Sequence, residues 1–497
     1  MNLTGVLPDS ARPPVSTVPV VRRGIDRFDA AALLLLVATY ALVAMLPFAP
    51  KKFGDLFFHE EAKALALAVR GAGPWQDFNI HHAPAPVFYY ALPYLAVPPG
   101  SGADIYWRAA FVWTTLWMGI SLLLIRRCGE ILGGPLVGKA AAVLTLLSPF
   151  SVYYSYGILA EPVGYLGVVF FTYGFLSWKI SPQDLSKSGW NLFLFSAGLL
   201  TFVLSRPNAV LFLLFAILVG AALVRCKNDN EKLEGKFVLA SALATIAVIA
   251  IVTLVLIRWS GGASENPQNQ NLGLVVMQGR FQFRTVLWDF RIWPDLPDNP
   301  DFIAFERQRE KFEHESLQTG QPFSALQWHW IAKDFLNHPG ITLRSGAIKF
   351  LALHLSFVHS LEPAKFHFAF LKGRLGYALF HLAVNACTIV LVIGSVLFLV
   401  AQRRNLLSYW VLWGPWVALT LFHVATYAEA RYLFPSRPCL VLMTSTAIVP
   451  RLQALFPKES RWPSLHESLK AIYPWFCNMI NTCRSDLELL KINGESL

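Results

Sequence analysis

Two adjacent carboxylates, two adjacent histidines and a Pro-Trp-Gln-Asp turn share one short stretch of the chain, residues 57–90, with the sequence FFHEEAKALALAVRGAGPWQDFNIHHAPAPVFYY. Glu60 and Glu61 precede a run of helix-forming residues that ends at Gly71, so we expect a short helix with acids in its first turn, where the helix dipole favours negative charge. A solvated helix start also accounts for two acids. Because a carboxylate in a partly desolvated loop can take a proton from a hydroxyl group, this stretch is the candidate reaction site.

Asp77 ends the turn, and His81 and His82 follow it at the start of a proline-rich run. Adjacent histidines in a loop lack the helical spacing of a strong metal motif. The pattern therefore leaves both phosphate contact and weak metal ligation open for His81 and His82.

Further charged residues stand at the ends of apolar segments: Glu161, Arg206, and the pair Glu429 and Arg431 followed by Tyr432. Each has a structural alternative. Glu161 could be an acid at a helix start, Arg206 an interfacial anchor, and Glu429 with Arg431 a local surface ion pair. Burying an ionisable group at the end of a membrane helix is energetically unfavourable, so such a group usually has an oppositely charged partner or a function. They are therefore functional candidates, and the position of the surrounding helices decides between the structural and the functional interpretation.

The composition indicates a polytopic membrane protein. Of 497 residues, 55% are hydrophobic and 15% charged, with a mean hydropathy of +0.46, whereas soluble domains carry about a quarter of charged residues. The net charge of +11 is compatible with nucleic-acid binding, but excess Lys and Arg in a membrane protein gather in cytoplasmic loops. The placement of the basic residues therefore separates the two classes.

Because a helix needs roughly 20 apolar residues to cross a bilayer, we predict an all-α fold with about ten spans (range about 9 to 13). The predicted spans are 30–46, 107–125, 136–153, 160–178, 190–205, 208–224, 237–257, 375–400, 407–425 and 433–449. Residues 87–97 and 341–358 are predicted to be amphipathic helices at the interface.

Basic residues alternate between the predicted loops, and by the positive-inside rule their side is the cytoplasm. These residues are the N-terminal arginines, Arg126, Arg127, Lys179, Lys187, Arg225, Lys227, Arg403, Arg404 and Arg451. The prediction is a cytoplasmic segment 1–29, a transmembrane domain 30–450 and a cytoplasmic tail 451–497, with external loops 49–106 and 258–374. All the candidate residues above then converge on the external face, and the nucleic-acid interpretation loses its main support.

The long external loop is rich in Trp and Phe, and disordered chains are poor in aromatic residues, so we expect it to be folded. Its last third predicts a helix, a break at Pro339-Gly340 and a second helix.

The six cysteines have no metal-finger spacing, and most fall in spans or on the cytoplasmic side. We expect free thiols.

The first external loop resembles that of the integral-membrane glycosyltransferases of fold class C that use polyprenyl-phosphate-linked sugars. These enzymes include bacterial aminoarabinose and galacturonosyl transferases and the protein O-mannosyltransferases. Glu161-Pro162, Arg206-Pro207 and Arg431-Tyr432 are similar to later elements of that family, and one departure is Glu60, where the family commonly has Asp. The loop matches in order at Glu60-Glu61-Ala62, Gly71, Pro74-Trp75-Gln76-Asp77-Phe78, His82, Pro84 and Phe88-Tyr89-Tyr90.

The resemblance implies an inverting transfer of a sugar from a polyprenyl-phosphate donor to a lipid, glycan or protein acceptor of the cell envelope. Glu60, with Glu61 second, would be the base, and Glu161 would position the acceptor, bind a metal or hold an arginine. Arg206, Arg431 and Tyr432 would bind the donor, and Asp77 and His82 would shape the loop or contact the head of the donor. A divalent ion is left open as a cofactor. The implied location is a bacterial inner membrane, with the site outside and both termini cytoplasmic.

Two other functions stay open from the sequence. A transporter or flippase of lipid-linked sugars predicts charges near mid-span, discontinuous helices and repeats. A polysaccharide polymerase that uses lipid-linked oligosaccharides also has a large external loop. The charges of this chain gather at the external mouth, which favours the transferase over the transporter.

Overall fold

The structure is a computed structural model that describes residues 24–45, 56–75, 83–148, 159–180, 185–206, 209–259, 267–287, 298–354, 374–428 and 430–455. Every regular element in these ranges is a helix, as predicted. Four of the six cysteines lie in the described ranges, and all four are free thiols, as predicted: Cys128, Cys226, Cys387 and Cys439.

Each of the ten predicted spans overlaps a helix. These are α1 (Arg27–Met45), α4 (Ala103–Gly133), α5 (Pro135–Leu146), α7 (Ala160–Ile180), α8 (Leu185–Ser205), α9 (Val210–Val224), α10 (Asp229–Trp259), α15 (Arg374–Ala401), α16 (Trp410–Ala425) and α17 (Arg437–Leu455). Two 3-10 helices, η9 (Arg403–Tyr409) and η10 (Ala430–Ser436), precede α16 and α17. Within the described ranges, 6 helices are long and apolar enough to cross a membrane, so the count of ten stays a prediction.

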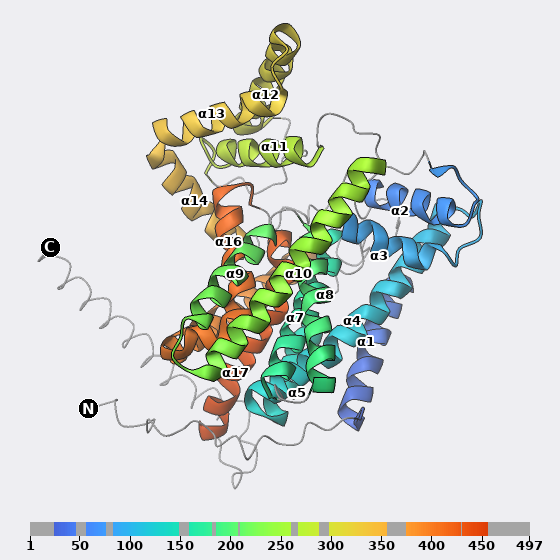
Figure 1. The fold of residues 1–497 in the computed structure, drawn as a ribbon, viewed down its shortest axis with the longest axis vertical. Helices are drawn as coiled ribbons and strands as arrows, with labels where there is room; N and C mark the ends of the chain where they lie inside the picture. The colour runs from blue at the N-terminus through green and yellow to red at the C-terminus, as the bar shows by residue number, and fades with distance from the viewer. Residues whose placement is uncertain are drawn as a thin grey trace, which may run out of the picture. The chain divides into compact units, whose positions relative to one another are not determined.

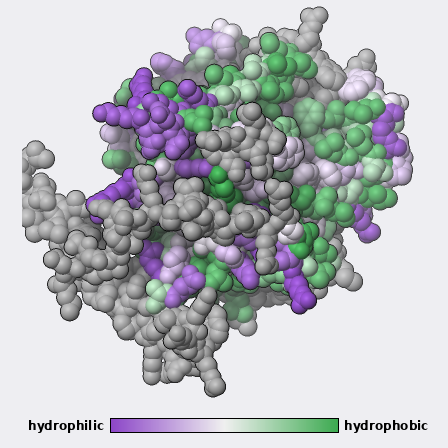
Figure 2. All heavy atoms as spheres, turned by 60° about the horizontal axis from the view of Figure 1, so that its bottom comes forward, coloured by the Kyte–Doolittle hydropathy of each residue, from purple (hydrophilic) through white to green (hydrophobic). Residues whose placement is uncertain are grey.

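Apolar side chains face outward along the helices. Leu34, Val112, Leu218, Leu254 and Leu382 are between 65% and 71% exposed, and Figure 2 shows hydrophobic residues over much of the visible flank. Soluble monomers rarely expose so much contiguous apolar surface, whereas a bilayer covers it. The protein is therefore a polytopic membrane protein.

The helices run so that candidate and basic residues separate to opposite ends of the bundle. We call the end where α4 and α7 begin and α8 and α16 finish the loop end, because α2 (Leu56–Val69) and α3 (Pro84–Tyr94) adjoin it (Figure 1). The opposite end carries the described basic residues of the predicted cytoplasmic loops up to Arg404. There Arg126 of α4 binds Asp26, Asp29 and Glu130, which ties α1 to α4. Which end faces the cytoplasm stays a prediction.

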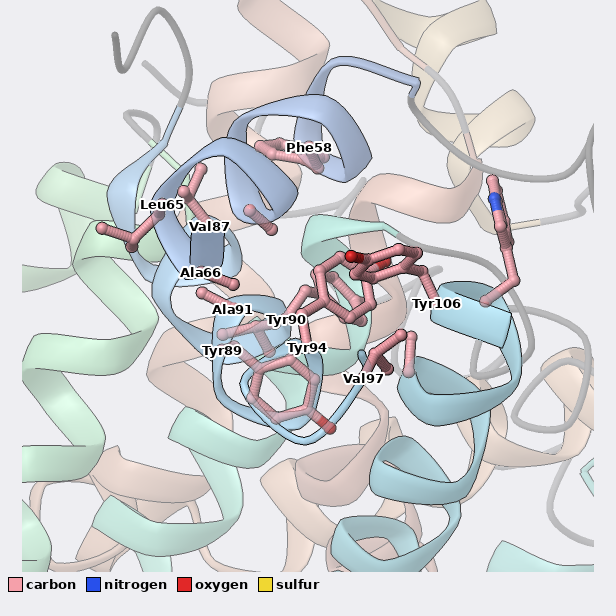
Figure 3. Close-up of a cluster of buried hydrophobic side chains, with 14 of the residues drawn as sticks. Phe58, Leu65, Ala66, Val87, Tyr89, Tyr90, Ala91, Tyr94, Val97 and Tyr106 are labelled. Atoms are coloured by element: carbon pink, nitrogen blue, oxygen red, sulfur yellow. The ribbon is translucent and has the colours of Figure 1, made fainter. Parts of the chain in front are cut away.

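Helix α2 starts earlier than the sequence indicated. It begins at Leu56 and has no acid in its first turn, so Glu60 and Glu61 lie inside the helix. The apolar residues before the acids extend the helix because Phe58 packs into a buried cluster with Ala62, Leu65 and Ala66 of the same face. Figure 3 shows this cluster between α2, α3 and α4. Helix α3 confirms the short helix predicted at residues 87–97, but it begins earlier, within the proline-rich run at Pro84, and ends at Tyr94.

The long loop after α10 forms four helices, α11 (Pro267–Phe281), α12 (Pro300–Thr319), α13 (Phe323–Asn337) and α14 (Pro339–His354), so it is folded, as predicted. The break between α13 and α14 is His338, directly before the predicted Pro339-Gly340, which begins α14. Met277, Phe281, Phe305, Phe312 and Ile331 share one apolar core. Helix α14 then contacts α16 and η10 at the loop end, as Figure 1 shows.

Glycines bring α7 and α8 into backbone contact. A Cβ on Gly198 would lie 2.4 Å from the backbone N of Phe171, and one on Gly167 would lie 2.7 Å from the backbone N of Phe202. Small residues are common where membrane helices approach this closely. The contact fixes the end of α8 against the start of α7, where Glu161 lies.

We predict that Gly198→Ala lowers the free energy of unfolding by about 1–3 kcal/mol, because the added methyl group pushes two backbones apart. Gly189→Ala is the matched control on the same helix, since nothing lies within 4 Å of its Cβ position. It should be neutral or stabilising by up to about 1 kcal/mol. Thermal unfolding in detergent measures both variants, and equal melting temperatures for Gly198→Ala and the wild type would contradict this packing.

Candidate active site

Four residues from three separate elements meet at the loop end of the bundle. Glu161 lies in the first turn of α7 and is 1% exposed. An Nη2 atom of Arg206, which follows α8, binds its Oε1, and Nε of Arg431 in η10 lies 3.6 Å from the same oxygen. The guanidinium groups of Arg206 and Arg431 lie 4.5 and 5.2 Å from the ring centre of Tyr432. We call Glu161, Arg206, Arg431 and Tyr432 the arginine cluster.

The packing of η10 on α7 places the arginine cluster. Gly164, one turn after Glu161, leaves little room for a Cβ because side-chain atoms of Ser205 and Pro435 would lie 3.0 and 3.1 Å from it. The rings of Tyr165 and Phe434 are stacked at 5.0 Å. These contacts hold the end of α8 and the 3-10 helix η10 against the first turn of α7.

The charges of the arginine cluster do not cancel. One carboxylate faces two guanidinium groups, and burying a carboxylate without a paired cation would be strongly unfavourable. Arg431 keeps 32% of its side chain exposed, and Nε of Arg206 is buried without a hydrogen-bond partner among the described residues. Because Nε of Arg206 lacks a partner among the described residues and Arg431 is partly exposed, the cluster can bind an anion, and guanidinium groups suit the geometry of phosphate.

Helix α3 connects the first loop with the arginine cluster. The hydroxyl group of Tyr90 donates to the carbonyl oxygen of Leu159 at 2.9 Å and accepts from the Leu159 N–H at 3.1 Å. Leu159 lies two residues before Glu161, so a fully buried tyrosine fixes the chain where α7 starts. Tyr94, one turn further along α3, contacts His59 of α2 instead.

Glu60 and Glu61 lie on α2, which packs on α3. The Glu60 side chain is 67% exposed, whereas Glu61 is 8% exposed. Burial raises the pKa of the Tyr94 hydroxyl group, and the negative charge of Glu60 raises it further, which reflects the closeness of Glu60 to α3. Of the two acids, Glu60 is thus the one whose carboxylate is open to a substrate.

Asp77, His81, His82 and Glu429 lie outside the described residues, and their roles stay predictions. In the described part of the chain, no group of three or more His, Cys, Asp or Glu is arranged to hold a metal ion. Two arginines beside Glu161 make its surroundings positive, which disfavours a divalent cation at that carboxylate. A metal bound by the undescribed histidines stays open.

Lys349 and Gln282 support the segment that leads to η10, and the sequence did not single out either role. Nζ of Lys349 in α14 donates to the carbonyl oxygens of Gly279 and Thr426, both at 2.6 Å. The side-chain amide of Gln282 bonds both to the backbone N–H and to the carbonyl oxygen of Ala428, at 2.8 and 2.9 Å. The long loop therefore holds the chain three residues before Arg431. The one sequence signal for the role of Lys349 was its position inside the apolar run IKFLALH.

His59 was also missed. It directly precedes Glu60, is 2% exposed and lies among the rings of Tyr94, Tyr106 and Trp107. Its position directly before two acids in residues 57–90 could have marked it as a candidate. That its imidazole is buried could not be predicted from the residue type.

Comparison with solved structures gives distant matches. The archaeal oligosaccharyltransferase AglB from Archaeoglobus fulgidus, solved with an inhibitory peptide and a dolichol-phosphate, has a TM-score of 0.49 and 13% identity over 90% of this chain. The chain spans about half the length of that protein (53%). ArnT from Cupriavidus metallidurans in the apo state has a TM-score of 0.33 and 12% identity over 86% of this chain and 78% of its own.

No family model and no curated protein matches the chain. Since both TM-scores are below 0.5, the proposals below rest on the residues of this chain.

Burial lowers the pKa of Lys349 to about 7, and the charge of Arg280 acts in the same direction. Between this pKa and the ordinary value of 10.5 the unfolded chain binds a proton that the folded chain does not. Stability from this group therefore rises with pH above 7. We predict that the free energy of unfolding of the wild type rises relative to Lys349→Met by about 2 kcal/mol from pH 7 to pH 9.

Chemical unfolding in detergent at several pH values measures this difference. Lys333→Met removes an exposed lysine from α13 and is the control, which should unfold like the wild type. A difference between wild type and Lys349→Met that stays flat or falls with pH would contradict the buried, uncharged amine.

Proposed function

We propose that this protein is a membrane glycosyltransferase that moves a sugar from a polyprenyl-phosphate donor to an acceptor at the loop end of the bundle. The observation that carries the proposal is the arginine cluster: Arg206 and Arg431 share one buried carboxylate, Nε of Arg206 has no hydrogen-bond partner among the described residues, and Arg431 is 32% exposed. The resemblance of the first loop supplies the class of donor. We place the loop end on the external side of a plasma membrane, since the basic residues of the short loops gather at the other end.

In the proposed reaction the acceptor oxygen attacks the anomeric carbon as its O–H proton passes to Glu60. The bond between that carbon and the phosphate oxygen breaks, and its electron pair leaves with the polyprenyl phosphate. A single displacement of this kind inverts the anomeric centre. The negative charge that develops on the leaving phosphate is stabilised by Arg206 and Arg431, whose positions are set before the reaction.

Glu161 has a positioning role in this scheme. Its carboxylate orients both guanidinium groups, and Tyr432 packs against their planes. If the acceptor is itself a phosphate, no strong base is needed, and Glu60 then orients the acceptor instead of deprotonating it.

One observation favours the alternative of a transporter or flippase. Arg437 at the start of α17 is 5% exposed and donates to Thr388, near the middle of α15, and to Ser148. A charge at mid-span depth is what a transport path predicts, and it departs from the expectation that charges gather only at the mouth. Release of polyprenyl phosphate from the donor distinguishes the two functions, since transport leaves the donor intact.

We predict that purified protein in lipid consumes a polyprenyl-phosphate monosaccharide and releases polyprenyl phosphate. Glu60→Gln should lower the rate by about 10²–10⁴, the usual contribution of a general base, and Glu61→Gln should lower it less because Glu61 is buried. Glu313→Gln, an exposed acid of α12, is the control. Lack of turnover with every such donor would reject the proposed function, and full activity of both Gln variants would reject only the base.

A further inference from the structure

His59 occupies a position that packing alone does not require. The side chain lies on α2, with ring centres 5.5 Å from Tyr94, 6.2 Å from Tyr106 and 5.4 Å from Trp107. Figure 3 shows Tyr94 of α3 and Tyr106 of α4 meeting beside the turn of α2 that carries Phe58. An aromatic or aliphatic side chain would fill such a site without placing two ring nitrogens inside it.

Only one of these two nitrogens has a hydrogen bond among the described residues. Nδ1 lies 2.8 Å from the hydroxyl oxygen of Tyr94, whereas Nε2 is buried with no hydrogen-bond partner there. Leaving a buried polar atom unpaired is unfavourable. Oε1 of Glu60 lies 3.9 Å from Nε2, and the Glu60 side chain is mostly exposed, so a small rotation brings it within hydrogen-bonding distance.

The surroundings favour an uncharged imidazole. Burial lowers the pKa of His59, the charge of Lys63 also lowers it, and the charge of Glu60 acts in the opposite direction. Nζ of Lys63 lies over the Tyr106 ring at 5.5 Å. A neutral imidazole carries one N–H, and when the Tyr94 hydroxyl group donates to Nδ1, that N–H is on Nε2, on the side of Glu60.

We propose that His59 is a positioning residue for Glu60: its Nε2–H donates to the Glu60 carboxylate and aims it at the acceptor, while the Tyr94 hydroxyl group fixes the tautomer. The inference rests on the proposed function, in which Glu60 is the base. A nucleophile or base that is oriented by a second group, itself held by a third, is a recurrent arrangement in enzymes. Here the three groups come from α2 and α3.

The test is a double-mutant cycle on the donor-consumption rate. His59→Phe keeps an aromatic side chain and removes both nitrogens, and it should lower the maximal rate about 10-fold or more, the usual effect of losing a hydrogen bond to a charged group. In the Glu60→Gln background the same substitution should change the rate little. An equal loss in both backgrounds would mean that His59 only packs, and it would overturn the proposal.

Three further measurements keep the result specific. His59→Gln restores an N–H donor and should recover part of the rate, and Tyr94→Phe should lower the rate in the same way as His59→Phe, only in the presence of Glu60. The acid limb of the pH–rate profile should move to higher pH in His59→Phe, because the carboxylate loses a hydrogen bond that favours its charged form. An unmoved limb, or no recovery with Gln in a folded variant, would overturn the proposal.

The same rates distinguish failure of the proposed function from failure of the inference about His59. If Glu60→Gln alone keeps full activity, the base is misassigned and the positioning role falls with it. If Glu60→Gln is inactive but His59→Phe, Tyr94→Phe and the wild type have equal rates, the proposed base stands and only the inference about His59 is wrong.

Discussion

The structure at the loop end depends on one constraint, the burial of the Glu161 carboxylate at the start of α7. A buried carboxylate requires cations or N–H donors, and here the partners are Arg206 and Arg431 from two distant parts of the chain. Two guanidinium groups thus surround one buried carboxylate and offset the cost of its burial. The residues that satisfy Glu161 are thereby also the residues that can receive a phosphate.

Much of the surrounding fold keeps these partners in place. Glycines let α7 and α8 touch, Tyr90 fixes the chain just before Glu161, and Lys349 with Gln282 holds the segment before Arg431. The first loop thus acts on one side of the arginine cluster and the long loop on the other. A change in either loop can therefore alter the proposed donor site without contact between that loop and the donor.

The sequence predicted most of the helices, because apolar runs of membrane length and proline breaks are local signals. It also named all four members of the arginine cluster, since charges at span ends are unusual. It did not reveal that Glu161 lies between two arginines, nor the roles of Lys349, Gln282 and Tyr90. Those contacts depend on packing and join residues at least 45 positions apart in the sequence. The early start of α2 was missed because the acids looked like a helix start, whereas the burial of Phe58 extends the helix.

The most direct test of the central claim is the binding of polyprenyl phosphate without a sugar. Arg431→Gln leaves Glu161 paired with Arg206, so it removes an anion donor without leaving a buried charge unpaired. Affinity measured by tryptophan fluorescence should fall about 10-fold or more in this variant, as expected for the loss of a charged hydrogen bond. Arg309→Gln on α12 should bind like the wild type, and neutral polyprenol should bind more weakly than the phosphate to the wild type. Equal affinity of wild type and Arg431→Gln for the phosphate would contradict the account.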